Sequence, residues 1–139
     1  MSALLRFSKY KGATGMNLHE EFLFTTNILI NNQRYPEAIS RLYYSILHYM
    51  ADYIELHGNI TIDRPNQSRI IETYRKITEC DVDINKFKAF REMCDYERNI
   101  KKRKTSNLFL LDIINKMNTF LQQQIHIADS HKLQPSSVF

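Results

Sequence analysis

The clearest pattern of apolar and polar residues lies in the segment 36 to 58, where apolar side chains recur at helical spacing. On a helical projection they fill one half of the circumference, and the charged residues fill the other half. This apolar arc is about twice as wide as a two-stranded coiled-coil seam, so we expect several helices to cover it. Pro36 suits a first helical turn, and Gly58 suits the residue that closes a helix. The pattern predicts a central helix whose polar half carries Glu37, Arg41, His48, Asp52 and Glu55, and whose apolar half runs to Leu56.

A first helix is predicted before the central one, from Asn17 to Asn31 or Asn32. Asn17 and Glu20 have the spacing of a capping box, in which the two residues satisfy N–H groups of the first turn. Only a few residues join this helix to the central one, and such a short connection forces an antiparallel pair. The residues expected on its buried side are Leu18, Phe22, Ile28 and Leu29.

Three helices are predicted after the central one: a short helix over residues 66 to 78, a longer one over residues 85 to 104, and a last one capped by Thr105 or Ser106. The predicted fold is therefore all-α, an up-and-down helical bundle of four long helices plus one short helix. We expect residues 1 to 16 to form a basic, loosely ordered arm, residues 17 to 130 the bundle, and residues 131 to 139 a flexible tail.

Composition supports one helical domain and narrows the setting. The 139 residues include only three Gly and three Pro, which leaves little material for hairpin turns. A net charge of +4 favours an anionic partner, although it also fits an ordinary basic protein. Two cysteines without metal-type spacing, and the absence of a signal peptide or membrane span, predict a cytoplasmic protein. No metal site or cofactor is expected from the residue pattern.

Two segments carry a resemblance to a known family. The central helix contains AISRLYYSILH, and the predicted helix over residues 85 to 104 contains REMCDY. This combination resembles small prokaryotic members of the HEPN superfamily (higher eukaryotes and prokaryotes nucleotide-binding), in which Ala-x-x-x-x-Tyr-Tyr-x-x-x-His precedes Arg-x-x-x-Asp-Tyr. The matching positions are Ala38, Tyr43, Tyr44, His48, Arg91, Asp95 and Tyr96.

The resemblance implies a HEPN-like bundle that forms a homodimer, in a toxin–antitoxin or phage-defence system. Active members are metal-independent endoribonucleases, in which an Arg is followed after four to six residues by a His. The His moves a proton and the Arg stabilises charge on the phosphate. This chain departs from that pattern, because Tyr96 stands where the His would first follow Arg91. With an ordinary pKa of about 10, a tyrosine is a poor base at neutral pH.

Arg41 and His48 reproduce the Arg-to-His spacing within the central helix. In one interpretation, His48 is an acid or base, Arg41 anchors phosphate, and Asp52 one turn later orients the imidazole. In the other, His48 is an ordinary, partly buried residue at a helix–helix border, and Glu37 with Arg41 and His48 with Asp52 form local surface pairs.

Arg91 and Asp95 are one turn apart, with Arg98 close by on the same face. They belong either to a charged cluster at a dimer or ligand cleft, in which Arg91 and Arg98 bind phosphate, or to a simple ion pair that fixes the helix against its neighbour. The basic run after them either neutralises nucleic-acid phosphates or is a solvated helix end. Its predicted RNA-binding residues are Arg98, Lys101, Lys102, Arg103 and Lys104.

The sequence thus predicts a protein that binds RNA or a nucleotide, with endoribonuclease activity as a further hypothesis. The alternative is a non-catalytic module that docks on a partner, such as a cognate antitoxin or a nucleotidyltransferase. The candidate catalytic residues are Arg91, Asp95, Tyr96, His48 and Arg41.

Overall fold

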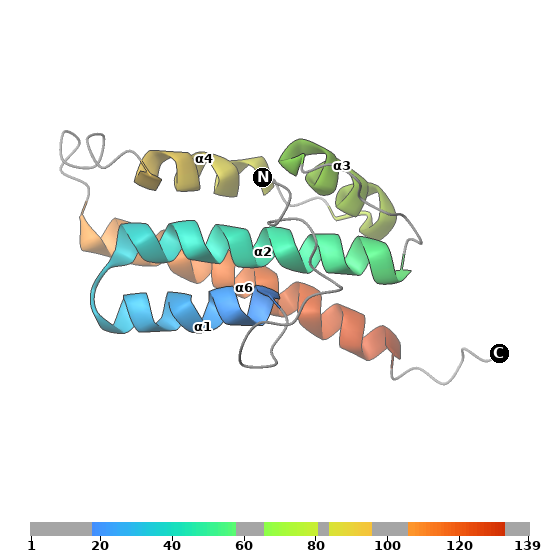
Figure 1. Ribbon diagram of the computed structural model, residues 1–139, viewed down its shortest axis with the longest axis horizontal. Helices are drawn as coiled ribbons and strands as arrows, with labels where there is room; N and C mark the ends of the chain where they lie inside the picture. The colour runs from blue at the N-terminus through green and yellow to red at the C-terminus, as the bar shows by residue number, and fades with distance from the viewer. Residues whose placement is uncertain (1–17, 58–65, 81–83, 96–105, 133–139) are drawn as a thin grey trace.

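A computed structural model of the protein describes residues 18–57, 66–80, 84–95 and 106–132. These residues form helices and, within those ranges, no strand. The all-α helical bundle predicted from the sequence is thereby confirmed (Figure 1). Its helices are α1 (Leu18–Asn31), α2 (Tyr35–His57), α3 (Gln67–Thr78), α4 (Ile84–Asp95) and α6 (Asn107–Lys132).

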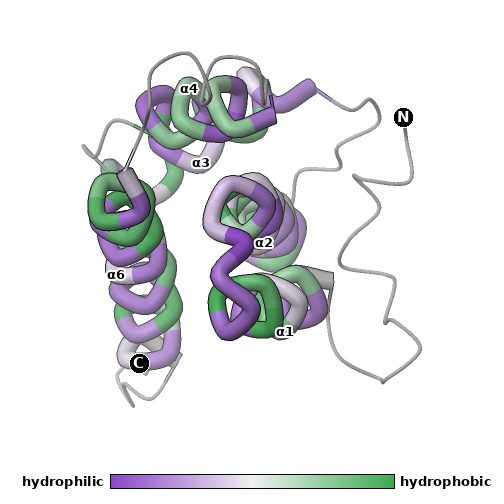
Figure 2. The backbone as a smooth tube through the Cα atoms, turned by 90° about the vertical axis from the view of Figure 1, so that its left-hand side faces the viewer, coloured by the Kyte–Doolittle hydropathy of each residue, from purple (hydrophilic) through white to green (hydrophobic). Residues whose placement is uncertain are grey.

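Helix α2 is the centre of the bundle. Each of the other four helices packs on it. In the end-on view, α2 lies between α1 on one side and α3 and α4 on the other, with α6 alongside (Figure 2). Helices α1, α2, α4 and α6 alternate in direction (Figure 1). Helices α3 and α4 lie end to end along the same side of α2. The central position predicted for residues 36 to 58 is therefore correct, and the described helix covers Tyr35–His57.

The connection between α1 and α2 is a tight turn. Gln33 adopts a left-handed backbone conformation with φ of 59°. Around it, the N–H of Arg34 donates to the carbonyl of Leu29 at 2.8 Å, and the N–H of Gln33 donates to the carbonyl of Ile30 at 3.0 Å. This pair of bonds is the Schellman arrangement that ends helices. It reverses the chain within a few residues, so α1 and α2 are antiparallel as the short connection predicted.

Two of the predicted helix starts are confirmed by capping bonds. The side chain of Asn66 accepts a hydrogen bond from the N–H of Arg69 at 3.1 Å. The hydroxyl of Ser106 accepts a hydrogen bond from the N–H of Phe109 at 3.2 Å. Ser106 is one of the two residues that were expected to cap the last helix. Each bond satisfies a backbone donor that lacks a partner within the helix. The capping box at Asn17 falls outside the described residues.

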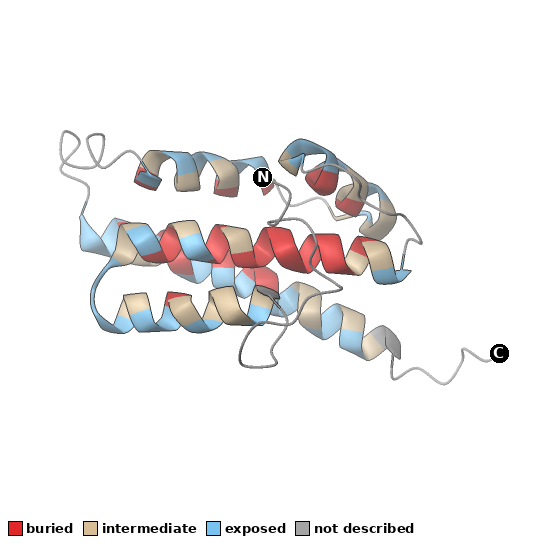
Figure 3. Ribbon diagram, viewed as in Figure 1, coloured by how far each residue is buried: buried red, intermediate tan, exposed pale blue. Residues whose placement is uncertain are grey.

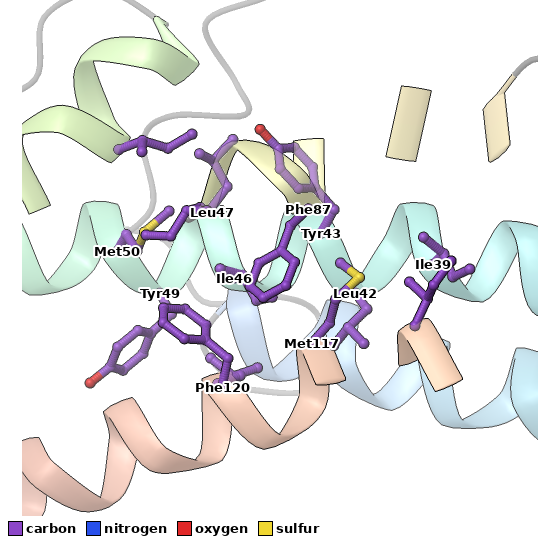
Figure 4. Close-up of a cluster of buried hydrophobic side chains, with 14 of the residues drawn as sticks. Ile39, Leu42, Tyr43, Ile46, Leu47, Tyr49, Met50, Phe87, Met117 and Phe120 are labelled. Carbon is purple, nitrogen blue, oxygen red and sulfur yellow. The ribbon is translucent and has the colours of Figure 1, made fainter. Parts of the chain in front are cut away.

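The hydrophobic core follows α2 (Figure 3). Side chains from α2 meet Phe87 of α4 and Met117 and Phe120 of α6 (Figure 4). The rings of Phe87 and Phe120 contact edge to face, with centroids 5.4 Å apart. The largest fully buried side chains are Tyr43, Tyr74, Ile39, Leu42, Ile46, Leu47, Met50, Ile54, Ile70, Ile84 and Leu110.

Some details of the predicted elements are wrong. Leu56 is 67% exposed. It lies one turn beyond Asp52, the residue of α2 that contacts His19 at the start of α1, so the described part of α1 does not reach it. Ile28 is also exposed, since the side of α1 that packs on the core carries the partly buried Leu23 and the buried Thr26 instead. Helices α3 and α4 have 12 described residues each, and the continuation of α4 to residue 104 stays a prediction because it lies outside the described residues.

Candidate functional site

Arg91 projects from α4 onto α2. Its guanidinium lies over the rings of Tyr43 and Tyr44, at 5.4 and 5.7 Å from their centroids. Nη1 also donates a hydrogen bond to Oδ2 of Asp95 at 2.8 Å, so the ion pair expected from the spacing is present. Burial alone would lower the pKa of Arg91, but the bond to Asp95 and the adjacent phenols raise it above its ordinary value. The side chain is therefore a firmly charged group with 16% of its surface exposed.

A groove of about 860 Å³ opens beside this ion pair, between α1, α2 and the end of α4. We call it the α1–α2–α4 groove. It contains Arg41 and Tyr44 from α2 and Asp95 from α4. Its other lining residues are Thr25, Leu29, Arg34, Pro36, Glu37, Ser40 and Cys94.

The two arginines of this groove are held in different ways. Nε of Arg34 donates to Oε2 of Glu37 at 2.6 Å, so its charge is locally compensated. The guanidinium of Arg41 lies 5.6 Å from the centroid of Phe22 and forms no ion pair among the described residues. An arginine over an aromatic face is positioned without losing its charge. Arg41 is therefore available to an anion.

A second depression of about 680 Å³ lies between the start of α3 and α4. We call it the α3–α4 hollow. Asp95 borders both this hollow and the groove, and Arg91 lines the hollow while it stacks on Tyr44 of the groove. The hydroxyl of Tyr43 donates to Oε1 of Gln67 at 2.8 Å, which ties α2 to the first turn of α3. The lining residues are Asn66, Gln67, Ser68, Lys88, Arg91, Glu92 and Asp95.

The structure corrects the placement of His48. The residue was expected on the polar half of the central helix, but it is 1% exposed because α1 covers that side of α2. Its ring stacks on Phe22 at 4.8 Å between centroids. Burial, together with the nearby His19, lowers its pKa to about 3. A neutral, buried imidazole outside the groove does not suit the acid or base role suggested by its spacing from Arg41.

Asp52 is likewise buried, and it does not orient His48 as the sequence suggested. Its Oδ2 lies 3.5 Å from Nδ1 of His19 in α1. The hydroxyl of Ser45 donates to the carbonyl of His19 at 2.7 Å. The ring of His19 also contacts the ring of Tyr49 edge to face at 5.4 Å. These polar contacts fasten the first turn of α1 to the middle of α2.

Other predicted site residues lie outside the described part of the chain. They are Tyr96, Arg98, Lys101, Lys102, Arg103 and Lys104. Within the described ranges, no group of three His, Cys, Asp or Glu side chains is arranged to hold a metal ion. None of the described helices has the length and apolarity that a membrane crossing requires.

Two site residues were missed in the sequence. Lys88 lies one turn before Arg91, and that spacing could have placed it on the same face of α4. Phe22 was expected only as a core residue, and its contact with Arg41 depends on the packing of α1 on α2.

Cys94 borders the groove as a neutral thiol, because burial and the adjacent Asp95 raise its pKa to about 12.

Comparison with known proteins does not place the chain in a family. No protein-family model matches it, and no solved structure is significantly similar. The chain is similar to GDP-fucose protein O-fucosyltransferase 2 of Plasmodium falciparum (isolate NF54), with 27% identity over 93 residues. The match includes 62% of this chain but spans only 17% of the length of that protein.

Proposed function

We propose that this protein binds the phosphates of RNA or of a nucleotide in the α1–α2–α4 groove. The observation that carries the proposal is Arg41, an exposed guanidinium held over Phe22 with no ion pair among the described residues. A phosphate can pair with Arg41 without displacing a carboxylate, and such charge-assisted hydrogen bonds are strong. Tyr44 borders the same groove, and the part of its ring that Arg91 leaves uncovered offers an aromatic contact for a base.

The described groove supports binding better than cleavage. His48 is buried beside α1, and burial raises the pKa of Tyr43 far above neutral. Neither group can exchange a proton with a ribose hydroxyl in the groove at neutral pH. Endoribonuclease activity is therefore a separate proposal, which rests on the resemblance of Arg91, Asp95 and Tyr96 to the HEPN superfamily. So do the proposed homodimer and the toxin–antitoxin or defence setting.

A second candidate function is a non-catalytic module that docks on a partner protein, such as a nucleotidyltransferase. It is supported by two exposed apolar side chains one turn apart on α1, Phe24 at 57% and Ile28 at 46% exposure. Exposed apolar pairs of this kind are common at protein interfaces. This candidate would gain weight if the groove bound no RNA.

The test is RNA affinity, measured by fluorescence anisotropy with labelled single-stranded RNA at several salt concentrations. Arg41→Gln should weaken binding about tenfold, the effect of losing one charged hydrogen bond. The matched control is Lys116→Gln, which removes one exposed positive charge on α6, where Lys116 pairs with Asp112 at 3.0 Å. Equal affinities for the two variants would overturn the proposal.

Cleavage is examined separately, by incubating the protein with total RNA and a chelator beside an Arg91→Ala control. Cleavage that disappears in Arg91→Ala would support the endoribonuclease proposal. Intact RNA together with Arg41-dependent affinity would leave binding as the function of the groove.

A further inference from the structure

We infer that the ligand is an extended single strand of RNA, which leaves the α1–α2–α4 groove, passes Arg91 and continues into the α3–α4 hollow. There Lys88 contacts a further phosphate. This inference rests on the proposed function, because it assumes that the groove binds phosphate. It adds a second binding subsite and excludes a mononucleotide as the complete ligand.

The first support is that the two depressions are adjacent and share a lining residue. Asp95 borders both, and it is held by Arg91 through a 2.8 Å hydrogen bond. Arg91 in turn lies over Tyr44, which lines the groove. A strand whose base stacks near Tyr44 therefore meets the Arg91 guanidinium next, and it enters the hollow on the other side of the ion pair.

The second support is the distribution of cations along this path. Arg41 lies in the groove, Arg91 at the junction, and Lys88 in the hollow. Arg41 and Lys88 form no ion pairs among the residues that the structure describes. Lys88 precedes Arg91 by three residues of α4, a rise of about 4.5 Å. Cations spread over two adjacent depressions suit a chain of phosphates, whereas a mononucleotide carries its phosphate at one end.

The hollow also offers the first turn of α3, which begins at Gln67 after its cap Asn66. Backbone N–H groups at a helix start carry partial positive charge and add to the attraction of Lys88.

Glu92 is a carboxylate in the hollow that would repel an anion, so substitutions in the hollow can either weaken or strengthen binding. Glu37 is paired with Arg34, and Asp95 is paired with Arg91. Glu92 has no ion pair within the described ranges, so its charge would repel a strand in the hollow. Removing Lys88 should therefore weaken binding of a long strand, and removing Glu92 should strengthen it.

The experiment uses the full chain with UMP and with single-stranded oligouridylates of increasing length. Affinity should rise with length until the strand spans both depressions. Lys88→Gln should weaken the binding of long oligouridylates about fivefold. It should also reduce the slope of log affinity against log salt concentration by about 0.7, the value for one phosphate contact on a single strand. Glu92→Gln should raise the affinity for long oligouridylates by a similar factor. UMP should bind both variants as it binds the unchanged protein.

The controls are Lys116→Gln and Asp112→Asn, which make the same charge changes at an exposed pair on α6. Circular dichroism establishes that each variant is folded. If Lys88→Gln and Glu92→Gln match these controls while Arg41→Gln still weakens binding, the second subsite is wrong and the proposed function stands. If Arg41→Gln also matches them, the proposed function itself fails.

Discussion

Arg41 and Arg91 both lie over aromatic rings, but within the part of the chain that the structure describes only Arg91 also has a carboxylate partner. A ring fixes the position of a guanidinium through its electron-rich face and leaves the charge uncompensated. The carboxylate of Asp95 satisfies part of the hydrogen-bonding capacity of Arg91. At the level of single residues, the proposed function therefore predicts that a phosphate pairs with Arg41 more readily than with Arg91.

His48 should make the protein sensitive to acid. Its pKa is lowered from 6.5 to about 3, so the folded state excludes a proton that the unfolded state accepts below pH 6.5. This contribution to stability is fully present above pH 6.5 and declines as the pH falls towards 3. Near pH 5 the loss should be about 2 kcal/mol, as urea unfolding at a series of pH values would measure.

The variant His48→Phe removes this titrating group, and His57→Gln removes an exposed histidine at the end of the same helix. Only the first variant should flatten the pH dependence between 6.5 and 5. If the unchanged protein and His48→Phe lost equal stability over that interval, the prediction for His48 would be wrong.

At the level of elements, α2 is central to the fold because each of the other described helices packs on it. Residues 45 to 52 of α2 are all buried, so its neighbours cover these middle turns on every side (Figure 3). The stability of the bundle therefore depends more on the side chains of α2 than on any contact between two outer helices.

Replacement of Ile46 by Ala should destabilise the protein strongly. The side chain is completely buried near Phe87, and its truncation leaves a cavity in the core. We expect a loss of about 3 kcal/mol in the free energy of unfolding, measured by chemical denaturation. Leu56→Ala, in the exposed last turn of the same helix, should change stability by less than about 0.5 kcal/mol. Similar losses for the two variants would contradict the central role of the middle turns.

The sequence was sufficient for the elements and only partly for the site. Helical periodicity and the polar residues Asn66 and Ser106 indicated where helices lie, because both effects are local. The spacing of Arg91 and Asp95 also predicted their ion pair correctly. One interpretation of the sequence placed His48, partly buried, at a helix–helix border, but its complete burial could not be predicted, since periodicity does not reveal how far α1 covers the polar half of α2. The contact of Arg41 with Phe22 likewise depends on packing between two helices.

At the level of the whole molecule, Gln124 joins three helices. Tyr49 of α2 donates to its backbone carbonyl at 3.2 Å, and Tyr74 of α3 donates to its side-chain Oε1 at 2.5 Å. Burial raises the pKa of Tyr49 to about 12, so its hydroxyl stays protonated as a donor. These bonds fix α6 relative to α2 and α3 at one level of the bundle.

Tyr74→Phe should lower the free energy of unfolding by about 1 kcal/mol, because Gln124 loses a hydrogen bond in a partly buried place. The control is Tyr53→Phe, which removes a neighbouring hydroxyl that makes no hydrogen bond among the described residues. Thermal unfolding of both variants would check the prediction. A control as unstable as Tyr74→Phe would show that Gln124 contributes little.

The tight turn at Gln33 has a consequence for synthesis of the protein. Helices α1 and α2 are close in sequence, so they can pair as soon as both have left the ribosome. The side of α2 that bears Leu42 and Ile46 then stays uncovered until α4 and α6 are translated. A nascent chain halted before α6 would expose this apolar surface, which is the kind of surface that chaperones bind.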